Sequence, residues 1–253
     1  MNVHVVSGVD GIRSDTLQHR TAVVIDVLRG TSVMVTALEH GCRAIVPVET
    51  VHQAKLLQEP GDLLGGERFC RKIAGFDFGN SPLEYHSPEL AGRKLILTTT
   101  NGTRALHKCK PAAHILAASL LNVTACAAYI MELKRDVVLI CAGTNDEFAF
   151  EDGLCAGMLL EELRRLGLDL ENMDDLGTML HRAYLQCAPQ LEAMLLACSN
   201  GRKLSRLGFE KDVLFCAQTS RWSTVPAVKD GLLLRALPGS KSCPPSYNES
   251  KPY

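Results

Sequence analysis

Three segments of the chain share one pattern, in which a short apolar run is followed by a polar loop and then by a helical repeat of apolar residues. The runs span residues 21–28, 94–100 and 136–143, and the helical repeats span 31–41, 103–109 and 150–167. Continuous apolar runs suit strands that are buried on both faces, and their alternation with helices favours an α/β fold. We therefore expect a mainly parallel or mixed central sheet with helices on both sides.

Further elements follow from the same reading. The runs RAIVPV, HILAAS and KDVLFCA (43–48, 114–119 and 211–217) are additional strand candidates. Residues 174–207 have a helical pattern that Pro189 interrupts, and we expect this segment to cover the sheet. We predict a single domain over residues 1–237. The segment 238–253 is rich in Pro, Ser and Lys and has no apolar period, so it is predicted to be disordered.

Composition excludes several classes of function. The 27 basic and 28 acidic side chains give a net charge of −1, which offers no general attraction for nucleic acids or membrane surfaces.

The ten cysteines are spread along the chain without a CxxC pair, so they favour buried thiols over disulfides or structural zinc. No cysteine has an arginine six positions later, as a thiolate phosphatase loop requires. We expect a cytoplasmic protein that binds a small anion, and the sequence is compatible with a homo-oligomer.

One charged residue interrupts the first apolar run. In TAVVIDVLRGTS (21–32), the carboxylate of Asp26 lies within an otherwise buried strand. An ionised carboxylate that is buried without a partner costs several kcal/mol, so such a group is usually paired, protonated or bound to a cation. Asp26 therefore needs a partner elsewhere in the chain.

Two polar loops at strand ends are candidates for anion binding, because ligands of open α/β sheets bind where strand ends meet helix N-termini. The loop after residue 98 has the sequence TTNGTR, and the loop after Asp26 has RGTS. Hydroxyls, backbone N–H groups and guanidinium groups suit an anion. The alternative is a plain polar turn in which Asn101 and Gly102 take positive φ. The candidate ligands are Arg29, Thr31, Ser32, Thr100, Asn101, Gly102, Thr103 and Arg104.

A third candidate segment, LLGGERFCRKIAGFDFGNSPLEY (63–85), is long, punctuated by glycine and too apolar for a simple linker. Loops of this length in compact domains are usually functional. Its candidate catalytic residue is Glu67, and its candidate substrate ligands are Arg68, Asn80 and Ser81. Alternatively, residues 79–82 form only a tight turn.

Three carboxylates at element ends, those of Asp26, Glu67 and Asp152, would form an oxygen-ligand set suited to Mg²⁺ if they converge. Two alternatives remain open. Asp152 begins a helix and is favoured there by the helix dipole alone. Asp26 could instead form an aspartyl phosphate, although Leu28 stands where that mechanism places a second aspartate as general acid.

Five segments in order resemble the 2-phosphosulfolactate phosphatase family across about residues 20–235: VVIDVLRGTS, GGERFCRKIAGFDFGNSPLEY, LTTTNGTRAL, CAGTNDEFAFEDGLCAG and FCAQTSRWSTVP. The resemblance implies a three-layer α/β/α fold. It also implies Mg²⁺-dependent hydrolysis of (R)-2-phospho-3-sulfolactate to 3-sulfolactate and phosphate, a step in coenzyme M biosynthesis.

The substrate that this resemblance implies carries phosphate, sulfonate and carboxylate groups, which Arg29, Arg68 and Arg104 would suit. Asp26, Arg29, Glu67 and Arg104 are accordingly the expected catalytic residues, with Mg²⁺ on Asp26, Glu67 and Asp152. Two alternatives are a phosphatase for another small phosphate ester, such as a sugar phosphate, and a noncatalytic binder of an organic dianion.

Overall fold

The computed structural model describes residues 1–145, 147–171 and 173–239. The predicted disordered tail, 238–253, lies outside the described residues apart from its first two positions. The strands are β1 (Val3–Val6), β2 (Thr21–Ile25), β3 (Ala44–Val48), β4 (Leu63–Arg68), β5 (Arg71–Lys72), β6 (Lys94–Thr98), β7 (His114–Ala118), β8 (Val137–Cys141), β9 (Val225–Lys229) and β10 (Leu232–Ala236).

The α-helices are α1 (Ser14–Leu17), α2 (Gly30–Glu39), α3 (Val51–Leu57), α4 (Gly102–Lys108), α5 (Val123–Leu133), α6 (Phe150–Arg165), α7 (Asp175–Cys187), α8 (Leu191–Ala197), α9 (Ser199–Arg206) and α10 (Glu210–Cys216). Short 3₁₀ turns are η1 (Val9–Gly11), η2 (Pro82–His86), η3 (Pro88–Leu90), η4 (Leu120–Asn122) and η5 (Ala188–Gln190). No helix of the described segments is long and apolar enough to span a bilayer.

The strands form one mixed sheet in the order β1-β8-β2-β7-β9-β10-β3-β6-β4-β5. Strands β1, β8, β2 and β7 form one parallel block, and β3, β6 and β4 form a second. The antiparallel hairpin β9–β10 joins the blocks through one residue pair on each side, Leu116 with Ala227 and Leu233 with Ile45. The expected mixed sheet is confirmed.

Strand β2 shows how both faces of the sheet are covered, because all five of its residues are buried. Val23 and Ile25 pack in the core cluster that contains residues of α5 and α6. Ala22 and Val24 pack in the cluster that contains residues of α2 and α4. Because successive side chains of a strand point to opposite faces, the two clusters lie on opposite sides of the sheet. The three α/β/α layers implied by the resemblance are confirmed.

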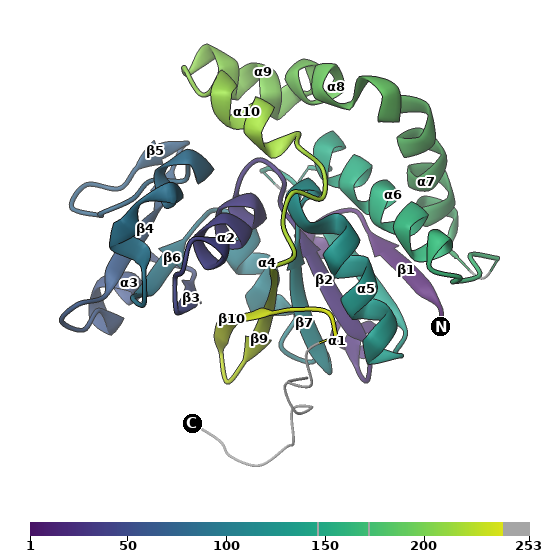
Figure 1. Cartoon of the computed structure of the whole chain (residues 1–253), viewed down its shortest axis with the longest axis horizontal. Coiled ribbons are helices and arrows are strands. Elements are labelled where there is room, and N and C mark those ends of the chain that lie inside the picture. The colour runs from purple at the N-terminus through teal and green to yellow at the C-terminus, as the bar shows by residue number, and fades with distance from the viewer. Residues whose placement is uncertain (146, 172, 240–253) are drawn as a thin grey trace.

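The helical segment after residue 174 divides into two parts at Pro189, which lies in η5. Helix α7 packs against α6, and its N-cap Asp174 accepts a hydrogen bond from the backbone N–H of Val5 on the edge strand β1, at 2.8 Å. Helices α8, α9 and α10 then form an arch at one end of the molecule (Figure 1). We call these three helices the cap.

The strand predicted at 211–217 is wrong, because these residues form most of α10. Asp212, Val213, Phe215 and Cys216 are its buried residues, and this spacing is that of one face of a helix. Gly41 and Gly167, the last residues of two predicted helical repeats, both have positive φ, at 90° and 92°, as residues just beyond a helix C-terminus often do.

Gly66 allows the end of β4 to approach β6. Its φ is +144°, and a Cβ there would lie 2.1 Å from the carbonyl oxygen of Thr98. Glu67 directly follows this contact, so the glycine sets where that carboxylate lies relative to the end of β6.

We expect Gly66→Ala to lower the free energy of unfolding by about 2–4 kcal/mol, because both the backbone angle and the Thr98 contact oppose a Cβ. Gly61→Ala is the matched control, since Gly61 also has positive φ, at +93°, but has no atom within 4 Å of the added Cβ. It should cost about 1 kcal/mol. Urea denaturation of both variants tests this, and equal losses would contradict the steric argument.

Candidate active site

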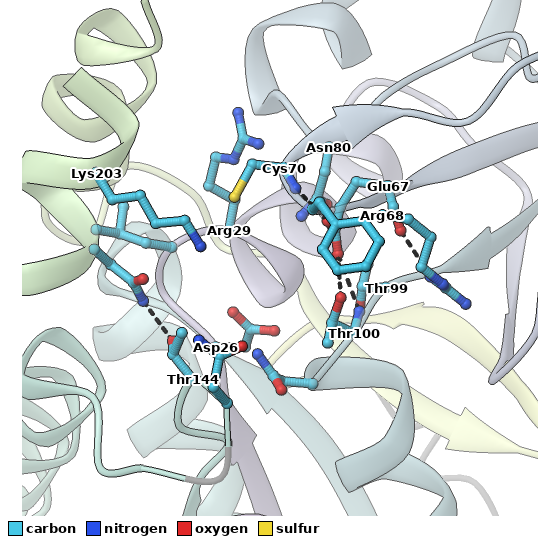
Figure 2. Close-up of a pocket in the computed structure, with 15 residues that line it drawn as sticks. Asp26, Arg29, Glu67, Arg68, Cys70, Asn80, Thr99, Thr100, Thr144 and Lys203 are labelled. Atoms are coloured by element: carbon cyan, nitrogen blue, oxygen red, sulfur yellow. Dashed lines mark hydrogen bonds between the residues drawn. The ribbon is translucent and has the colours of Figure 1, made fainter. Parts of the chain in front are cut away.

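A cleft of about 190 Å³ lies where β2, β4 and β6 end, with residues of the cap on its opposite wall (Figure 2). It brings together residues that are far apart in sequence and belong to both parallel blocks. The predicted site residues that line it are Asp26, Arg29, Glu67, Arg68, Asn80, Thr100 and Asn101.

Asp26 lies directly after β2 and is 7% exposed. Its Oδ1 accepts a hydrogen bond from the backbone N–H of Gly30 at 3.1 Å. A Cβ at Gly30 or at Gly102 would lie only 2.4 or 2.7 Å from its Oδ2. The first residues of α2 and α4 therefore enclose the carboxylate, and a Cβ at either position would force the carboxylate to shift.

Burial raises the pKa of the Asp26 carboxyl group from its ordinary value of 3.8 to about 6. The negative charges of Glu67 and Glu151 also raise this pKa, whereas hydrogen bonds from the N–H groups of Gly30 and Gly102 lower it. Because Asp26 lines the cleft, the partner that its charge needs can come from a ligand.

Glu67, at the end of β4, connects two loops of the second parallel block. Its Oε1 accepts hydrogen bonds from the backbone N–H and the hydroxyl of Thr100, at 3.1 and 2.7 Å, and its Oε2 accepts one from the N–H of Cys70 at 2.8 Å. Cys70 and the 89% exposed Phe69 form the β4–β5 turn with positive φ at both residues. The neighbouring Arg68 is held by its own hydrogen bonds to the carbonyls of Glu67 and Glu49 and to the hydroxyl of Thr98.

Arg29 is fixed by the cap. Its guanidinium donates to Oδ2 of Asp212 on α10 at 2.5 Å and lies 4.4 Å from the centre of the Phe209 ring. Both ionic side chains are almost fully buried. The hydroxyl of Ser81 donates to the other oxygen of Asp212 at 2.7 Å, so Ser81 positions this pair and does not line the cleft.

Asp152 does not line the cleft either, so its position gives no support to its prediction as a metal ligand beside Asp26 and Glu67. Its two carboxylate oxygens accept hydrogen bonds from the backbone N–H groups of Val27 and Gly143, at 2.8 and 3.0 Å. Burial first, and then the charges of Glu151 and Asp26, raise its pKa well above the ordinary value. No group of three acidic, histidine or cysteine side chains in the described part of the chain is arranged to hold a metal ion.

Arg104 lies on α4 outside the cleft and forms an ion pair with Asp10, so its predicted catalytic contact is not supported by its position. The hydroxyls of Thr31, Ser32 and Thr103 donate to the carbonyls of Asp26, Val27 and Thr99, respectively. These three residues shape the loops instead of facing the cleft. Gly102 contacts Asp26 as described, and neither Asn101 nor Gly102 has the positive φ of the alternative polar turn.

Sequence reasoning did not identify the residues on the cap side of the cleft. Asn200 and Lys203 of α9 face the cleft together with Thr144 and Asn145 of the β8–α6 loop. The side-chain amide of Asn200 donates to Thr144 Oγ1 at 2.5 Å and to Glu151 Oε1 at 2.7 Å. In sequence, α9 shows only an amphipathic helix with basic residues, which does not distinguish a cleft wall from a solvated face.

Comparison with known proteins agrees with the family resemblance of the sequence motifs. The family model of 2-phosphosulpholactate phosphatase matches residues 7–231. The chain is 40% identical over 215 residues to a probable 2-phosphosulfolactate phosphatase of Thermotoga petrophila, covering 85% of this chain and 92% of that protein. Proteins with the same name in Thermotoga maritima and Clostridium acetobutylicum are 41% and 38% identical, covering 85% and 92% of this chain and 92% and 100% of theirs.

The raised pKa of Asp26 predicts a pH-dependent cost in stability. The carboxyl group of Asp26 loses its proton near pH 3.8 in the unfolded chain and near pH 6 in the folded chain. The stability that the protonated form contributes to the fold is therefore fully present below about pH 4 and is lost as the pH rises through about 6. Without divalent cations, Asp26→Asn should therefore be more stable than the unmodified protein by about 2–3 kcal/mol at about pH 7.5. The difference should vanish near pH 4 in urea denaturation. A difference that is constant across this range would contradict the assignment.

The buried pair of Arg29 and Asp212 predicts a strongly asymmetric mutational response. Asp212→Ala leaves the guanidinium buried without its partner and should lower the free energy of unfolding by about 3–5 kcal/mol. The double variant Arg29→Met with Asp212→Leu removes both charges and should cost less than the single variant. Ser81→Ala, which removes only one hydrogen bond to Asp212, is the control. Urea denaturation measures all three, and a double variant that is less stable than Asp212→Ala would contradict the prediction.

Proposed function

The chain belongs to the 2-phosphosulpholactate phosphatase family, and from this membership we propose that it hydrolyses (R)-2-phospho-3-sulfolactate to 3-sulfolactate and phosphate. The observation that carries the proposal is the composition of the cleft. The cleft is lined by the buried carboxylate of Asp26 and by three basic residues, Arg29, Arg68 and Lys203, of which Lys203 extends toward Asp26 (Figure 2). Such a site suits a small organic acid with several negative charges.

A Mg²⁺ ion bound in the cleft is part of the same proposal, and the buried negative charge around Asp26 supports it. Four carboxylates in this region are buried, those of Asp26, Glu67, Glu151 and Asp152. The charges of Glu67 and Glu151 raise the pKa of Asp26, and the charge of Asp26 raises the pKa of Asp152. The nearby Arg29 offsets only part of this charge, because one of its N–H groups is paired with Asp212. Mg²⁺ needs only one or two protein carboxylates, with water and substrate phosphate as its other ligands. We therefore propose Asp26 and Glu67, which line the cleft, as the protein ligands, without Asp152.

A bound Mg²⁺ would neutralise charge on the phosphate group during transfer. The chain itself orients the substrate. Arg29, held in place by Asp212, stabilises negative charge on the transferring group, and Thr100 and Asn101 provide polar contacts at the end of β6. Glu67 accepts hydrogen bonds from Thr100 and from Cys70 in the β4–β5 turn, so it also fixes these two loops of the second parallel block beside the phosphate.

The wider setting is part of the same proposal. We place the reaction in the cytoplasm and in coenzyme M biosynthesis, as the resemblance implies. The alternatives of another small phosphate ester or of noncatalytic binding make different predictions in the experiment below.

The test is phosphate release from 2-phosphosulfolactate and from a panel of sugar phosphates and simple phosphate esters, with Mg²⁺ and with a chelator. We expect Mg²⁺-dependent turnover with phosphosulfolactate preferred. Asp26→Asn should lower kcat by about 10²–10³-fold, as loss of one strong electrostatic contact does. Asp15→Asn, which changes an exposed acid on α1, is the matched control.

Each alternative has its own outcome. Preference for a sugar phosphate would assign a different substrate, and saturable binding without phosphate release would assign a binding protein. Turnover that a chelator leaves unchanged would remove Mg²⁺ from the proposal. Near-normal kcat for Asp26→Asn would remove Asp26 from the reaction.

A further inference from the structure

The cap presents one lysine to the cleft. Lys203 lies on α9, and its side chain extends from the helix toward the space above Asp26 (Figure 2). Within residues 1–145, 147–171 and 173–239, its ammonium group has no hydrogen-bond or ion-pair partner. The charge of Lys203 is therefore available to a ligand.

The other two cations of the cleft are already engaged. Arg29 is paired with Asp212, and Arg68 donates to two backbone carbonyls and one hydroxyl. Among the described lining residues, Lys203 is thus the one cation without a hydrogen-bond or ion-pair partner, and a second strongly acidic group of a substrate can use all of its N–H donors. This cation lies on the wall opposite Glu67 and Thr100, which belong to the strand ends (Figure 2).

Helix α9 holds this lysine in a defined place. Asn200, one turn earlier, is hydrogen-bonded to Thr144 Oγ1 and Glu151 Oε1 across the cleft wall. At the other side of α9, a Cβ on Gly201 would lie 1.8 Å from the carbonyl oxygen of Leu195, so α9 packs directly on the backbone of α8. A cation on a fixed helix loses less freedom when it binds an anion than one on a loose loop.

A second hollow adjoins the cleft at this point. It has a volume of about 220 Å³ and shares Thr144, Asn145, Asn200 and Lys203 with the cleft. Lys203 thus lies where the two hollows meet, and a substrate group beyond the phosphate has space to reach it.

We infer that Lys203 forms the subsite for the sulfonate group of the substrate, an inference that rests on the proposed function. The reacting phosphate belongs at the strand ends, beside Asp26 and Glu67. In phosphosulfolactate the carboxylate is attached directly to the carbon that bears the phosphate, whereas the sulfonate is one carbon further away. The sulfonate, as the more distant group, is therefore the one that reaches Lys203 on the wall opposite Glu67. A lysine ammonium is a compact point charge that suits the three equivalent oxygens of a sulfonate.

The test compares two substrates that differ only in this group: 2-phosphosulfolactate and 2-phospholactate. Lys203→Met should lower kcat/KM for phosphosulfolactate by about 10–100-fold, as loss of a charged hydrogen bond does. Its kcat/KM for phospholactate should change by less than about threefold. Lys203→Arg should retain most of the preference. Lys211→Met, an exposed lysine on α10 that does not line the cleft, should leave both substrates unaffected.

A binding measurement separates this inference from the proposed function. Calorimetric titration with 3-sulfolactate and with lactate needs no turnover, and Lys203→Met should weaken binding of sulfolactate alone. Equal effects on both ligands, or no effect on either, would overturn the subsite. Failure of the unmodified protein to release phosphate from phosphosulfolactate would overturn the proposed function, while the titration would still decide whether Lys203 binds a sulfonate.

Discussion

The enclosure of one carboxylate by two helix N-termini is the constraint on which the rest of the site depends. Asp26 follows a fully buried strand, and the first residues of α2 and α4 come so close to it that a Cβ at Gly30 or Gly102 would overlap its Oδ2. These two helices follow strands of different parallel blocks. Their convergence on one side chain brings the polar loops of both blocks to a single cleft, and the same burial makes ionisation of that side chain costly.

The cap completes the cleft through a second buried charge. Asp212 on α10 fixes Arg29 from the first block and also accepts the hydroxyl of Ser81 from the second. A buried ion pair is seldom a large net source of stability, but it does select one arrangement of the groups that it joins. Here it fixes the guanidinium in the wall of the cleft and links α10 to the loops of both blocks. Helix α9, packed beside α10, adds Asn200 and Lys203 to the opposite wall.

Local patterns in the sequence predicted the layers and the position of Asp26, because a continuous apolar run and a polar strand end are properties of a few neighbouring residues. They did not predict which groups pair across the chain. Arg29 and Asp212 are 183 residues apart, and nothing near either one indicates the other. Asp152 was predicted as a metal ligand beside Asp26 and Glu67, but it does not line the cleft, and its oxygens accept hydrogen bonds from two backbone N–H groups. The run at 211–217 is short enough to fit a strand or a helix, and only its packing in the cap decides for a helix.

The hairpin β9–β10 meets each parallel block through a single residue pair of the ladder, so the hydrogen-bonded sheet is narrow at this junction. Asp26 and Arg29 come from one side of this junction, and Glu67 and Thr100 come from the other. Each half keeps its own hydrogen-bond ladder, yet neither half contains a whole site. The spacing between the two sets of side chains therefore depends on the contacts that cross between the halves, those of Asp26 with Gly102 and of Asp212 with both Arg29 and Ser81.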